Sequence, residues 1–113
     1  MTSSWTLQNI DGANSYVTTL RAGVDMDTEI LEMNPTFIEA SVFIRNPDSN
    51  TVQFLGTNIP LDTAVMADFL QVFPDITVEE YSNGFRTAVT GISFLIPGGV
   101  TSDIKISILE QLR

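Results

Sequence analysis

The stretch "PTFIEASVFIRN", Pro35–Asn46, decides the expected fold class of this chain. Apolar and polar residues alternate along it, which is the two-residue period of a β-strand rather than the roughly 3.6-residue period of a helix. One face of the strand would carry Ile38, Ala40, Val42 and Ile44, and the other Phe37, Glu39, Ser41, Phe43 and Arg45. We therefore expect a strand that is buried on one face, with two phenylalanines among the polar residues of the other.

The same period recurs on both sides of this stretch. "VTSDIKISILEQL" alternates again near the carboxyl end, and "SWTLQNI" and "SYVTTLRAGV" are strand candidates near the amino end. After the turn "NPDSN", the segment "TVQFLG" is expected to return as a hairpin partner. Between the turn signals "YSNG" and "PGG", the segment "FRTAVTGISFLI" is expected to form one long strand, with Gly91 at a bulge or a close approach.

One segment departs from the strand pattern. In "LDTAVMADFLQVFPD" the apolar residues recur at helical spacing, with Asp62 as a possible N-cap and Pro74 at the stop. We predict a short helix there, about residues 62–73. Together these elements indicate an all-β fold, an antiparallel β-sandwich or jelly-roll-like domain with one short helix, formed by residues 1–113 as a single domain. A partly open barrel is the alternative.

Charge limits the partners of this chain. Its 113 residues include 14 acidic and 5 basic ones, giving a formal net charge of −9. The basic residues are scattered singly: Arg21, Arg45, Arg86, Lys105 and Arg113. Binding to nucleic acid requires a cluster of basic residues on one face, and binding to an anionic membrane surface requires basic residues as well. We therefore expect protein partners, with no nucleic acid and no membrane.

The chain contains neither histidine nor cysteine, which removes thiolate chemistry, disulfides and the usual acid–base group near neutral pH. Lys105 is the only lysine, and its strand would point it to solvent rather than toward a nucleophile. We expect no catalysis and no cofactor. The amino-terminal residues resemble no signal peptide, so synthesis in the cytoplasm is expected, with incorporation in a virion as one destination.

The densest acidic segment is "GVDMDTEILEMNP", Gly23–Pro35. In an extended backbone, Asp25, Asp27 and Glu29 would share one face and could offer oxygen ligands to calcium. An EF-hand loop would then need glycine and glutamate where the chain has Ile30 and Thr36. A solvated or partner-facing acidic surface is therefore the favoured interpretation, with a calcium site as the minor one.

The leading hypothesis is a non-catalytic structural or interaction protein that oligomerises or decorates a larger assembly. A chain with one lysine has few means of protecting strand edges, and Phe37, Phe43 and Trp5 are the candidate interface residues. In size and composition the chain is similar to small virion components such as capsid decoration or tail accessory proteins. The alternative is a small carbohydrate- or ligand-binding β-module, with aromatic residues at Trp5, Tyr16, Tyr81 and Phe85 as a stacking platform.

Overall fold

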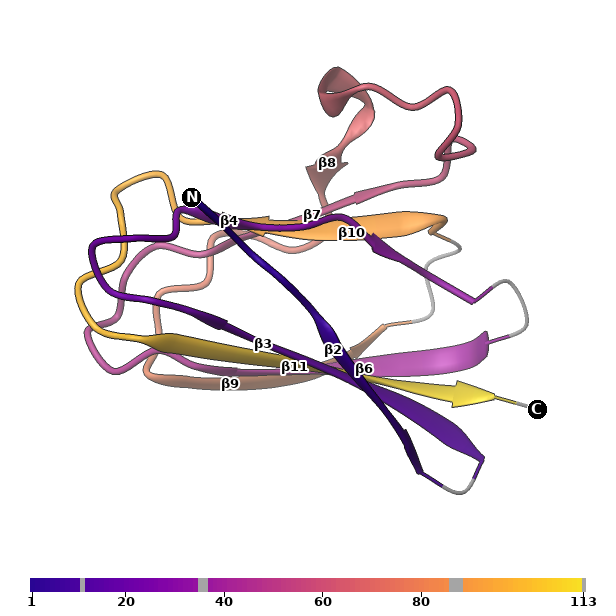
Figure 1. Ribbon diagram of the computed structural model, residues 1–113, viewed down its shortest axis with the longest axis horizontal. Helices are drawn as coiled ribbons and strands as arrows, with labels where there is room; N and C mark the ends of the chain where they lie inside the picture. Colours follow the sequence, from indigo (N-terminus) through magenta and orange to yellow (C-terminus); the bar gives the residue numbers. More distant parts are fainter. Residues whose placement is uncertain (11, 35–36, 86–88, 113) are drawn as a thin grey trace.

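Two β-sheets face each other in a computed structural model of the chain (Figure 1). It describes residues 1–10, 12–34, 37–85 and 89–112, and the side chains of all of these except Ile10, Phe37, Ile38 and Leu112. The six-stranded sheet consists of β1 (Thr2–Ser3), β4 (Asp27–Thr28), β5 (Leu31–Glu32), β10 (Gly91–Leu95), β7 (Gln53–Thr57) and β8 (Leu70–Gln71). The five-stranded sheet consists of β2 (Thr6–Ile10), β3 (Ala13–Leu20), β11 (Ile104–Leu112), β6 (Phe37–Arg45) and β9 (Glu80–Phe85).

The strand order is that of a jelly roll. The five-stranded sheet has the order β2-β3-β11-β6-β9, and the other has the order β1-β4-β10-β7-β8, with β5 also paired to β10. When β4 and β5 are counted as one interrupted strand, each connection from β3 to β11 crosses to the other sheet except the one from β7 to β8, which pair within the six-stranded sheet, as in a jelly roll. The predicted all-β sandwich or jelly-roll-like fold is confirmed.

The stretch Pro35–Asn46 contains β6, which pairs antiparallel with β11 and β9. Ala40, Val42 and Ile44 are buried, whereas Phe43 and Arg45 are exposed, so the predicted alternation holds for these residues. Residues with small or β-branched side chains pack well against a facing sheet, which explains why this face points inward. The first two residues of the quoted stretch, 35 and 36, lie outside the described residues.

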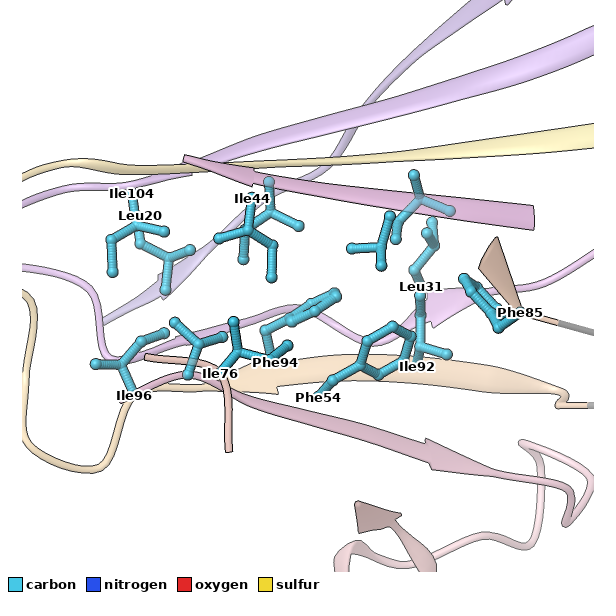
Figure 2. Packing of buried hydrophobic residues seen from close by; sticks show 14 of the residues in the cluster. Leu20, Leu31, Ile44, Phe54, Ile76, Phe85, Ile92, Phe94, Ile96 and Ile104 are labelled. Carbon is cyan, nitrogen blue, oxygen red and sulfur yellow. The ribbon is translucent and has the colours of Figure 1, made fainter. Parts of the chain in front are cut away.

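The core lies between the sheets, and Figure 2 shows its isoleucine and phenylalanine side chains meeting from both layers. Phe54 of β7 is fully buried at its centre. Its ring centroid lies 4.6 Å from that of Phe94, 5.3 Å from Phe85 and 5.5 Å from Phe73. Buried isoleucines of β11 face these rings from the other sheet: Ile104, Ile106 and Ile108.

The predicted hairpin between β6 and β7 is wrong. β7 pairs with β10 and β8 in the six-stranded sheet, so the turn after β6 carries the chain from one sheet to the other. The buried Asn46 side chain stabilises this crossing, because its amide donates to the Asn50 carbonyl at 2.7 Å and its oxygen accepts from the Asn50 N–H at 3.0 Å. The turn sequence therefore indicated that the chain reverses here, but not which sheet the next strand joins.

The long strand predicted around Gly91 is in fact two strands in different sheets. β9 ends at Phe85 and pairs with β6, whereas β10 begins at Gly91 and pairs with β7. "YSNG" lies inside β9 and is not a turn. The close approach at Gly91 is confirmed, since a Cβ there would lie 2.8 Å from Cδ2 of Leu61 and 3.2 Å from Cγ2 of Ile30.

The helix predicted about residues 62–73 is only one turn of 3₁₀ helix, Met66–Asp68, followed by the short strand β8. The Val72 N–H donates to the Phe54 carbonyl at 2.9 Å, which continues the pairing of this segment with β7. Tertiary pairing and burial of Phe69 thus override a helical pattern too short to be stable alone. In the described residues, no helix is long and apolar enough to cross a membrane.

Candidate functional site

The outer face of the five-stranded sheet carries the candidate residue Phe43. Strand register fixes its neighbours, since Phe43 lies opposite Ser107 of β11 on one side and Ser82 of β9 on the other. Side chains in such directly opposed pairs have Cβ atoms about 4.5–5.5 Å apart. Phe43 is 56% exposed and lies between two hydroxyl-bearing residues.

Two cations lie beside this ring. Arg45 of β6 is opposite Lys105 of β11 and Glu80 of β9, one register row beyond Phe43. In the described part of the chain the one ion pair joins Arg21 to Asp25, so Arg45 and Lys105 are not neutralised by a carboxylate within 4.0 Å. A locally basic spot is unusual on a protein with a net charge of −9. Its natural complement is an acidic group from another molecule.

A groove of about 600 Å³ runs over these residues. We call it the outer groove and define it by its outward-facing lining residues: Phe43, Arg45, Glu80, Ser82, Lys105 and Ser107. A second hollow of about 350 Å³ adjoins it along the same strands and includes Leu109, whose side chain is 39% exposed. The face therefore combines apolar contact area with hydrogen-bond donors and positive charge, a composition suited to binding a protein segment or a polar ligand.

The three acids of the calcium hypothesis do not gather. Asp27 accepts a hydrogen bond from the Thr2 hydroxyl at 2.6 Å, and Glu29 accepts one from the Ser4 hydroxyl at 3.3 Å. Asp25 is buried and turned toward Arg21 instead. Among the described residues, which include all three acids, no group of three or more carboxylates is placed to hold a metal ion.

Asp25 has a structural role in the turn after β3. Its Oδ2 accepts hydrogen bonds from the Arg21 backbone N–H at 2.9 Å and from the Arg21 Nε at 3.2 Å. The backbone hydrogen bond, aided by the guanidinium, holds the pKa of Asp25 below its ordinary value of 3.8 despite its burial. The Oδ1 atom is buried and has no hydrogen-bond partner among the described residues.

We expect the Asp25→Asn substitution to lower the free energy of unfolding by about 1–3 kcal/mol at neutral pH, because it removes charge-assisted hydrogen bonds. A lowered folded-state pKa stabilises the fold above the unfolded pKa, and this contribution is lost as pH falls through the folded value. The difference in free energy of unfolding between wild type and Asp25→Asn should therefore disappear at acid pH. Urea unfolding between about pH 7 and pH 2 measures it, with Asp62→Asn as the exposed control. An undiminished gap at the acid end would contradict this account.

Trp5, the third interface candidate, is not on the outer face. Its indole N–H donates to the Glu29 carbonyl at 2.8 Å, and its ring packs 6.1 Å from that of Phe94. The other aromatic residues of the carbohydrate hypothesis are also engaged elsewhere: the Tyr16 hydroxyl donates to Glu110, Tyr81 packs on Phe73, and Phe85 packs on Phe54. They form no common stacking platform. The Phe37 side chain, the remaining candidate, lies outside the described side chains.

Sequence reasoning missed the segment that joins β7 to β8. Val65, Met66 and Leu70 are 60%, 62% and 71% exposed, although their spacing had assigned them to a buried helix face. The available signal was Pro60, which with Asp62 and Thr63 indicates a turn rather than a helix start. The Thr63 and Ala64 N–H groups do donate to the Pro60 carbonyl, at 3.0 and 2.9 Å.

No protein-family model matches this chain, and no curated protein is similar to it in sequence. Solved structures share its fold at low identity. A cleaved adhesin domain of Lys-gingipain from Porphyromonas gingivalis has a TM-score of 0.54 at 9% identity, with 98% of this chain and 85% of that one covered. A mutant of a family 29 carbohydrate-binding module has a TM-score of 0.50 at 17% identity, covering 95% and 76%. The SPBc2 prophage-derived protein YomS has a TM-score of 0.50 at 13% identity, covering 93% and 97%.

Proposed function

We propose that this protein is a non-catalytic interaction module that builds or decorates a protein assembly through the outer groove. The observation that carries the proposal is Phe43, a large aromatic side chain that is 56% exposed on a rigid sheet, with the cations Arg45 and Lys105 in the next row of the same face. Aromatic residues and arginine are enriched among residues that dominate binding energy at interfaces. A sheet supports such a site better than a loop because its backbone does not have to become ordered on binding.

The partner surface that fits the outer groove carries an apolar side chain beside carboxylates. The apolar group would cover Phe43, and the carboxylates would pair with Arg45 and Lys105. The groove is a small part of a full interface, since stable interfaces bury about 800 Å² on each partner. Incorporation in a virion is the form of assembly that size and composition favour.

We expect wild-type protein to form species heavier than the 12.4 kDa monomer at high concentration, and Phe43→Asp to abolish them. Aspartate places a charge where an apolar side chain must be buried, while the exposed position limits the loss of monomer stability to about 1 kcal/mol. Size-exclusion chromatography with light scattering, from micromolar to millimolar concentration, measures the mass. Leu7→Asp serves as the control because Leu7 is 51% exposed on β2 and outside the groove.

Two results would count against the proposal. If Phe43→Asp assembles as well as wild type, the outer groove is not the interface. If wild type remains a monomer throughout, self-association through this face is excluded and the binding-module candidate takes its place.

That second candidate is a carbohydrate-binding module using the same groove. It is favoured by the hydroxyl, guanidinium, ammonium and carboxylate groups that surround a single exposed ring. Affinity electrophoresis in gels containing soluble polysaccharides tests it. Retardation of wild type, lost in Phe43→Ala, would favour the carbohydrate module over the assembly protein.

A further inference from the structure

Residues 58–70 form a projecting loop that stands away from the sandwich, on the side of the six-stranded sheet (Figure 1). Its backbone is held by specific hydrogen bonds. The Asp68 carboxylate accepts from the Val65 N–H at 2.9 Å, and the Phe69 N–H donates to the Met66 carbonyl at 3.1 Å. Phe69 within the loop is buried. The projecting loop is therefore a built element with a defined outer surface.

This loop presents much of the exposed apolar surface of the protein. Leu70, Met66 and Val65 are 71%, 62% and 60% exposed. Among the large apolar side chains that the structure describes, only Met1 at 78% is comparably exposed, and Phe43 of the outer groove follows at 56%. Single exposed apolar residues are ordinary, but a cluster on one loop marks an interaction surface.

The loop and the outer groove are complementary in charge. Residues 58–70 contain Asp62 and Asp68 and no lysine or arginine. The groove offers Arg45 and Lys105 against the single carboxylate of Glu80. The loop thus has the apolar side chains beside carboxylates that the groove requires, and the groove volume of about 600 Å³ suits insertion of a few side chains.

The two surfaces cannot meet within one chain. In Figure 1 the projecting loop lies beyond β7 and β10, whereas β6, β9 and β11 form the opposite layer. The groove lies on the outer face of that layer, so the body of the sandwich separates the two. A contact between loop and groove must therefore join two copies, and such a heterologous contact propagates into an open chain or closes into a ring.

We propose that the projecting loop of one copy docks in the outer groove of the next, so that the protein assembles head to tail. The inference rests on the proposed function and names a second copy of this chain as the partner. Val65, Met66 and Leu70 cover Phe43, and Asp62 and Asp68 face Arg45 and Lys105.

Two variants test the two halves of the contact separately. Met66→Asp damages the loop and leaves the groove intact, whereas Phe43→Asp damages the groove and leaves the loop intact. Each variant alone should show an apparent dissociation constant raised about 30-fold or more in sedimentation velocity. Met26→Asp is the matched control, because Met26 is 48% exposed and belongs to neither surface. Circular dichroism confirms that each variant remains folded.

Mixing the two variants gives the decisive result. The intact loop of Phe43→Asp should enter the intact groove of Met66→Asp, so an equimolar mixture should form a 1:1 dimer of twice the chain mass and nothing larger. If wild type assembles and the mixture does not form this dimer, the inference is overturned.

The outcomes also separate this inference from the proposed function. Loss of assembly in Phe43→Asp with full assembly in Met66→Asp would overturn the loop as partner while keeping the groove as interface. Full assembly in Phe43→Asp would overturn both. A wild-type protein that is monomeric at millimolar concentration would overturn head-to-tail docking.

Discussion

Replacing Phe54 with alanine is expected to lower the free energy of unfolding by about 3–5 kcal/mol, the range for removing a buried aromatic ring from a packed core. Phe54 is fully buried, and its ring contacts the rings of Phe94, Phe85 and Phe73. These four rings come from several segments and both sheets, so no single neighbour can move to fill the resulting cavity. The loss is a large fraction of the roughly 5–15 kcal/mol that stabilises an ordinary domain.

Thermal and urea unfolding of Phe54→Ala measure this effect, and Tm should fall by more than about 10 °C. Phe43→Ala is the matched control, since it removes the same ring from an exposed site and should cost about 1 kcal/mol or less. Equal losses in the two variants would show that the packing around Phe54 is not what the structure indicates.

The second large effect is expected at Glu110, a fully buried carboxylate at the end of β11. Its Oε1 accepts from the Asn14 amide and the Tyr16 hydroxyl, both at 3.1 Å, and its Oε2 accepts from the Asn34 N–H at 2.8 Å. Glu110→Ala removes the acceptor of all three hydrogen bonds and leaves the partly buried Asn14 amide and Tyr16 hydroxyl without it. We expect a loss of about 2–4 kcal/mol at neutral pH, since each unpaired buried group costs about 1–3 kcal/mol.

A spectroscopic measurement separates the role of the Glu110 charge from simple packing. Burial, followed by the negative charge and hydrogen bond of Glu110, raises the pKa of Tyr16 above 10.0. Stability is therefore lost as pH rises from about 10 through the folded pKa. In Glu110→Gln the charge is absent, so the pKa of Tyr16 should move back toward 10.0, as measured by ultraviolet titration in a Tyr81→Phe background.

Glu32→Ala provides the control, since the same substitution is made at an exposed glutamate of β5. A loss at Glu32 equal to that at Glu110 would contradict the assignment of stability to the buried hydrogen bonds.

The sequence predicted which face of a strand is buried better than it predicted which strands pair. In β6 and β11 one side is buried, so alternation of side chains identified both strands and their inward residues. Alternation carries no information on which sheet a strand joins, and for that reason β7 and β10 were misassigned. Most residues of both strands are buried or nearly buried, whichever face they point to. Their sequences therefore show no clear polar face that could indicate which sheet they join.

The residues of the candidate site could be predicted from the sequence only in part. The strand pattern placed Phe43 on the outer face, where the structure also places it. The pattern also placed Arg45 on that face, but Lys105 and Glu80 could not be found, because register between strands distant in the chain brings them beside Arg45. The projecting loop was missed because its apolar residues have the spacing of a buried helix face. Turn hydrogen bonds at Pro60 and Val65 hold the backbone in a loop instead.

The position of β11 governs how the protein can reach its native state. This last strand lies at the centre of the five-stranded sheet, between β3 and β6, and the Asn14–Glu110 hydrogen bond joins residues 96 positions apart. Until β11 has been synthesised, β3 and β6 therefore have no shared neighbour, and the backbone edges that pair with β11 remain open. Folding dominated by such distant pairings is slow, on the scale of milliseconds to seconds. Closure of this sheet thus depends on β11, and until it has formed, the open strands are the part of the molecule most exposed to mispairing.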